Sequence, residues 1–72
     1  MFDEIKKVLA AEKRGEKISL QEVCKLNEKL AAMPLLSLTR GQLMFHGKYQ
    51  IQLRNLRDKL VESLQEELDE NH

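Results

Sequence analysis

Cys24 and His46 are the two side chains inside predicted helices that could take part in nucleophilic, acid–base or metal chemistry. A ligand or base on the same helix would have to stand three or four residues away. At those distances from His46 the sequence has Gln42, Leu43, Tyr49 and Gln50. Cys24 would need a base from elsewhere in the chain, and a single cysteine excludes an internal disulfide. We therefore expect a satisfied, partly buried imidazole, a buried structural thiol, and a protein that is not an enzyme and holds no metal or cofactor.

The charged residues balance overall but are unevenly distributed. The chain has 12 Lys and Arg residues and 12 Asp and Glu residues, so its global field favours neither nucleic acid nor a membrane surface. Residues 34–61 hold five basic residues and one acidic residue, whereas residues 62–72 hold five acidic residues and no basic one. This separation predicts that the chain's charges orient a contact with another molecule.

The composition is rich in Leu, Lys and Glu and poor in aromatic residues, Gly and Pro, which predicts an all-α fold without a β-sheet. We expect one domain, 1–72, with two short helices in a hairpin at 3–14 and 20–33 and a long C-terminal helix at 40–70. A domain this small is stabilised by only a few kcal/mol unless something assists it. The prediction is therefore a helical-bundle homodimer.

Helix-end signals place these boundaries. They are Asp3 as an N-cap, Gly15 as a left-handed residue after the first helix, the capping boxes Ser19–Glu22 and Thr39–Gln42, and Pro34 as a stop. Between the last two helices, the apolar segment 34–38 predicts an ordered loop whose leucines are anchored on the core. Those leucines are Leu35, Leu36 and Leu38. Phe2 and Phe45 are expected to be core residues, while Met44 and Ile51 are either a second contact face or a small exposed patch.

The long helix carries one continuous apolar stripe. Its members are Tyr49, Leu53, Leu56, Leu60, Leu64 and Leu68, at steps of three or four residues. A helix of roughly 30 residues is about 45 Å long, whereas a globule of this chain length is about 30 Å across. We expect the first half of the stripe to face the two short helices and the second half to contact a second chain.

We predict an antiparallel homodimer whose charges pair across the interface. The apolar contacts would be Leu56, Leu60, Val61, Leu64 and Leu68. The basic residues Arg54, Arg57 and Lys59 would lie beside the acidic residues Glu62, Glu66 and Glu67 of the other chain, which would also offset the repulsion between these acidic residues and the helix dipole. The alternative is a solvated acidic end with no partner.

The function predicted from these features is binding. We expect a small cytoplasmic regulator or adaptor, of the kind that bacteria and their phages use, that binds a larger protein. No apolar run is long enough for a membrane span, and the first residues do not resemble a signal peptide. One alternative is a nucleic-acid-binding regulator that contacts phosphates through Arg40, Lys48, Arg54 and Arg57. Another is a small structural subunit of a larger assembly.

Overall fold

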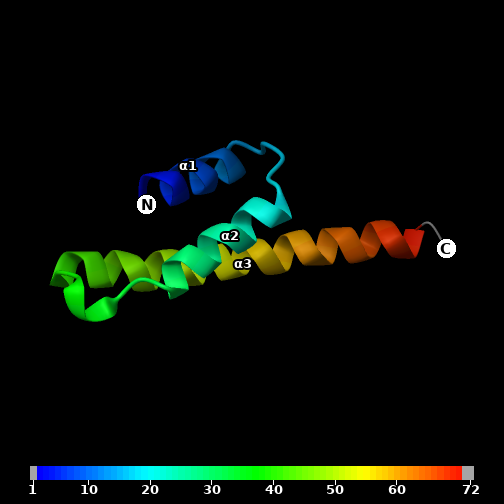
Figure 1. Cartoon of the computed structure of the whole chain (residues 1–72). Coiled ribbons are helices and arrows are strands. Elements are labelled where there is room, and N and C mark those ends of the chain that lie inside the picture. The colour runs from blue at the N-terminus through cyan, green and yellow to red at the C-terminus, as the bar shows by residue number, and fades with distance from the viewer. Residues whose placement is uncertain (1, 71–72) are drawn as a thin grey trace.

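A computed structural model describes residues 2–70 as an all-helical chain. Its elements are α1 (Phe2–Lys13), α2 (Leu20–Ala31), a single 3₁₀ turn η1 (Leu35–Ser37) and α3 (Arg40–Glu70). In Figure 1, α1 and α3 run in the same direction and α2 runs against both. The prediction of an all-α fold with a long C-terminal helix packed on the other helices is confirmed.

The two ends of α1 show where the predicted signals act. Gly15 has φ +80°, its N–H donates to the Glu12 carbonyl at 3.0 Å, and the Glu16 N–H donates to the Ala11 carbonyl at 3.0 Å. This pair of bonds is a Schellman motif, which ends the helix as predicted. The N-cap prediction is wrong, because α1 already includes Phe2 and therefore has Asp3 in its first turn. There the carboxylate faces the positive end of the helix dipole.

The two predicted capping boxes differ in the structure. At the start of α3 the Thr39 N–H donates to Gln42 Oε1 at 2.9 Å, and the Gln42 N–H donates to Thr39 Oγ1 at 3.2 Å, which confirms that box. At the start of α2 the Ser19 side chain makes no capping bond. Ser19 and Glu22 are both exposed, so water can satisfy their polar atoms. The predicted Ser19–Glu22 capping box is therefore wrong.

The segment between α2 and α3 is ordered but is not anchored as predicted. The Ser37 hydroxyl donates to the Pro34 carbonyl at 2.8 Å, and the backbone forms the turn η1. Leu35 is half exposed and Leu36 is fully exposed, while Leu38 alone is half-buried. The turn lies at the end of the molecule beyond α1 (Figure 1), and there Leu35 and Leu36 stay exposed.

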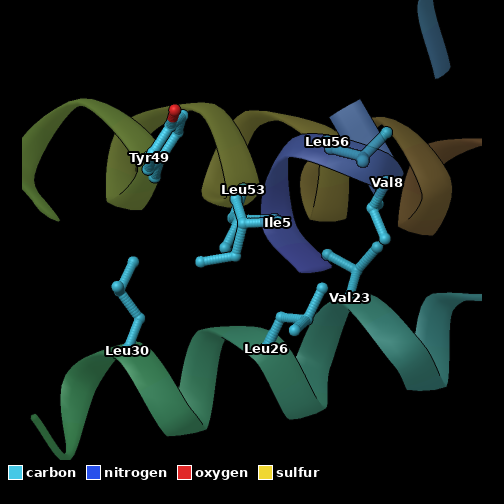
Figure 2. Close-up of a cluster of buried hydrophobic side chains, with 8 residues drawn as sticks. All are labelled: Ile5, Val8, Val23, Leu26, Leu30, Tyr49, Leu53 and Leu56. Atoms are coloured by element: carbon cyan, nitrogen blue, oxygen red, sulfur yellow. The ribbon is translucent and has the colours of Figure 1, made fainter. Parts of the chain in front are cut away.

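The core lies where α1 and α2 meet the first half of α3. Figure 2 shows its eight buried hydrophobic side chains, which are Ile5, Val8, Val23, Leu26, Leu30, Tyr49, Leu53 and Leu56. They come from all three helices, and α2 packs on α3 more extensively than α1 does. The first half of the predicted stripe is therefore an intrachain contact, as expected.

The molecule is elongated because α3 continues past the core. Its extents are 49 × 23 × 14 Å, and α3 is unbroken at Gly41 and Gly47. Figure 1 shows the C-terminal end of α3 running beyond the start of α2. Every residue from 61 to 70 is exposed, so about one third of this helix lies outside the core.

Candidate functional site

The exposed end of α3 carries an apolar stripe, which we call the terminal stripe and define as Val61, Leu64 and Leu68. Their exposed fractions are 37%, 46% and 63%. Of the other predicted interface leucines, Leu60 is half-buried against the core and Leu56 is a core residue. The structure therefore divides the predicted interface into an intrachain part, which ends at Leu60, and an uncovered part, which is the terminal stripe.

The acidic residues of the predicted interface lie on the same exposed end of α3 as the terminal stripe. Glu62, Glu66 and Glu67 are all exposed, and none of the ion pairs between residues 2–70 includes them. They lie in the last turns of α3, where the helix dipole is negative and carboxylates repel it. This end of the helix thus carries both exposed apolar side chains and carboxylates that form no ion pair among the described residues.

The basic residues of the predicted interface differ in whether they form ion pairs within their own chain. Lys59 Nζ donates to Glu12 Oε1 at 3.1 Å and so ties α3 to α1. Arg57 is half-buried and pairs with its neighbour Asp58 at 3.3 Å, while Arg54 is exposed. Arg54 is therefore the predicted interface base with no intrachain ion pair among the described residues.

The residues predicted to contact nucleic acid do not share one face. Arg40, Lys48 and Arg54 are exposed and Arg57 is half-buried. At 3.6 residues per turn, the four positions spread over about half of the helix circumference.

A cleft of about 550 Å³ lies between α1 and α3. We call it the lysine groove and define it by its four lysines, which are Lys6, Lys13, Lys48 and Lys59, and by its apolar floor, which is Leu9, Tyr49 and Leu56. The groove could not be predicted from the sequence, because it exists only once α1 is placed beside α3. One signal was present: Lys6 and Lys13 are seven residues apart, which puts both on one side of α1.

A second cleft, of about 540 Å³, lies between the α1–α2 connection and the root of the exposed end of α3. Ile18 lines it from the connection, and Leu60 and Leu64 line it from α3. The Glu12–Lys59 ion pair borders both clefts. Leu64 therefore continues an apolar surface that begins at the core.

The surroundings of His46 and Cys24 indicate structural roles for both side chains. His46 is 8% exposed, and its Nε2 lies 2.8 Å from the Leu30 carbonyl oxygen, to which it donates. This confirms the prediction of a satisfied imidazole. Cys24 is half-buried, so the prediction of a buried thiol was too strong. Within residues 2–70 no three His, Cys, Asp or Glu side chains are grouped as they would be around a metal ion.

The remaining large side chains of α3 form an aromatic cluster and an exposed patch. Phe45 stacks on Tyr49 with centroids 5.9 Å apart, and Lys6 Nζ lies 6.0 Å from the Phe45 centroid. Phe45 is 47% exposed, so it is not the core residue that was predicted, because α1 covers only one side of its ring. Met44 and Ile51 are 76% and 63% exposed, which settles the alternative left open for them in favour of a surface patch.

Comparison of the chain with protein-family models, curated proteins and solved structures finds no match. No helix in the described part of the chain is long and apolar enough to cross a membrane. The fold and the exposed surfaces therefore define a small all-helical protein with one uncovered amphipathic helix end and one cationic groove.

Proposed function

We propose that this protein is a non-catalytic protein–protein interaction module that self-associates through the exposed end of α3. The observation that carries the proposal is that α3 extends past the core with residues 61–70 all exposed, although Val61, Leu64 and Leu68 lie among them. Monomeric proteins cover most side chains of this kind, since full burial of one leucine is worth about 1.5–3 kcal/mol. A second copy is the simplest cover, and a homodimer is the smallest such assembly.

The charges support the same proposal. The exposed end carries five acidic residues at the negative end of a helix dipole, and a contact with basic side chains of another chain would offset that repulsion. A contact of this kind should weaken in salt, because exposed charges are screened over a Debye length of about 10 Å at 0.1 M.

We also propose that the assembled protein serves as a regulator or adaptor that binds a larger protein in the cytoplasm. The exposed patch of Met44 and Ile51 lies on the other half of α3, so it remains available when the terminal stripe is covered. A free cysteine in the chain fits the reducing cytoplasm.

The test is charge insertion into the terminal stripe. Leu64→Glu combined with Leu68→Glu should abolish self-association in sedimentation equilibrium, because a buried unpaired carboxylate is strongly destabilising. Both positions are exposed in the single chain, so helix content by circular dichroism should not change.

The matched control is Met44→Glu combined with Ile51→Glu, which adds the same charge to two exposed apolar residues of the same helix. The control should associate like the unmodified protein. If the stripe variant also keeps the unmodified association constant, the proposed function is wrong.

A further inference from the structure

We propose that the lysine groove is the receiving surface for the exposed end of α3 of a second copy of this chain. This inference rests on the proposed function and adds to it the identity of the contacted surface. It replaces side-by-side pairing of two α3 helices by insertion of residues 61–70 of one chain between α1 and α3 of the next.

The lysine groove has positive charge that its own chain does not neutralise. Among the described residues, Lys6, Lys13 and Lys48 form no ion pair. Glu12 is the acidic side chain that lines the groove, and it is held by Lys59 at 3.1 Å. The groove therefore presents three ammonium groups that form no ion pair among the described residues, two from α1 and one from α3, above a floor of Leu9, Tyr49 and Leu56. One of them, Lys6 Nζ, lies 6.0 Å from the Phe45 ring centroid.

The exposed end of α3 has the complementary chemistry. Between 61 and 70 it carries five acidic residues and no basic one, together with the terminal stripe. An amphipathic helix of this kind binds a groove by placing its apolar side on the floor and its charged flanks at the rims. Ten helical residues are about 15 Å long, and the groove extends along α3 from Lys48 to Lys59, which is about 17 Å, so the segment is comparable with the groove in length.

The occupant has to come from another copy. The chain's own residues 61–70 continue the same unbroken helix that forms one wall of the groove, and Figure 1 shows that end pointing away from α1. Glu66 lies seven residues past Lys59, which is about 10 Å further along the helix axis. No turn in α3 lets this segment fold back.

The two contacting surfaces are different parts of the molecule. The groove is lined by residues 6–13 of α1 and 48–59 of α3, whereas the terminal stripe begins at Val61, so no residue belongs to both. A contact between two unlike patches is heterologous, and a heterologous contact leaves one free groove and one free end after each addition. The inference therefore predicts that association continues past the dimer as concentration rises.

The decisive experiment is a mixing test with two variants. Lys6→Glu with Lys13→Glu reverses the charge of one wall of the groove and leaves the terminal stripe intact. Leu64→Glu with Leu68→Glu disables the terminal stripe and leaves the groove intact. Each variant alone should remain at the monomer mass of 8.4 kDa. An equimolar mixture should form a heterodimer that grows no further, because its one working groove and its one working end occupy each other and only the disabled groove and the disabled end remain free.

Controls separate failure of this inference from failure of the proposed function. Lys7→Glu with Lys25→Glu makes the same charge change at exposed lysines outside the groove and should associate normally. If the terminal-stripe variant is monomeric but the groove variant still associates, the groove assignment is overturned and self-association stands. If both variants are monomeric and the mixture stays monomeric, the contact is two-fold and the inference is wrong. If the terminal-stripe variant associates normally, the proposed function fails as well.

Discussion

His46 links the end of α2 to α3 through one buried hydrogen bond. Its Nε2 donates to the carbonyl of Leu30, in the last turn of α2, where helix carbonyls lack partners within the helix. The absence of ligands three or four residues away predicted a structural histidine. Its partner could not be predicted, because Leu30 is 16 positions away in the chain and reaches His46 only after α2 packs on α3.

We predict that His46→Leu lowers the free energy of unfolding by about 0.5–1.5 kcal/mol, since it removes this hydrogen bond and leaves the Leu30 carbonyl with the Met33 N–H, at 3.3 Å, as its donor. Urea unfolding at a fixed protein concentration measures the change. His46→Gln keeps an N–H donor and should lower the free energy of unfolding by less. Equal stability of His46→Leu and the unmodified protein would mean that this hydrogen bond contributes nothing to the fold.

Helix ends show most clearly what local sequence determines. Gly15 and the Thr39–Gln42 box were predicted and formed, because each depends on backbone geometry and on residues within a few positions. The leucines of the 34–38 segment were placed wrongly, because their burial depends on whether another element covers them. Leu36 is fully exposed for that reason alone.

Two glycine substitutions should have opposite effects. Gly15→Ala should destabilise the protein by about 1–2 kcal/mol, because φ is +80° there and a Cβ disfavours left-handed backbone. Gly47→Ala should stabilise it by about 0.5–1 kcal/mol, because it lies inside α3 and an added Cβ meets no atom within 4 Å. Thermal or urea unfolding distinguishes the two. A destabilised Gly47→Ala would show that this part of α3 has a different backbone from the one described.

The shape of the whole molecule follows from one long helix and two short ones. The sequence predicted that α3 would extend past the core, since its length follows from the residue count and the rise of a helix. It also predicted Leu60, Val61, Leu64 and Leu68 as uncovered residues; the structure places the last three on the exposed end and Leu60 half-buried against the core. The lysine groove was missed, because it depends on how α1 lies across α3. The predicted basic partners, Arg54, Arg57 and Lys59, therefore all lie on α3, whereas the proposed receiving surface includes Lys6 and Lys13 of α1.

The central claim is that the exposed end of α3 binds another copy of the chain. The most direct test is the mass of the unmodified protein in solution, measured by light scattering across a concentration series at low and high salt. We predict that the mass rises from 8.4 kDa to at least twice that value with increasing concentration, and that high salt lowers it. A mass of 8.4 kDa at every concentration up to about 1 mM would contradict the claim, because even a weak dimer is populated there.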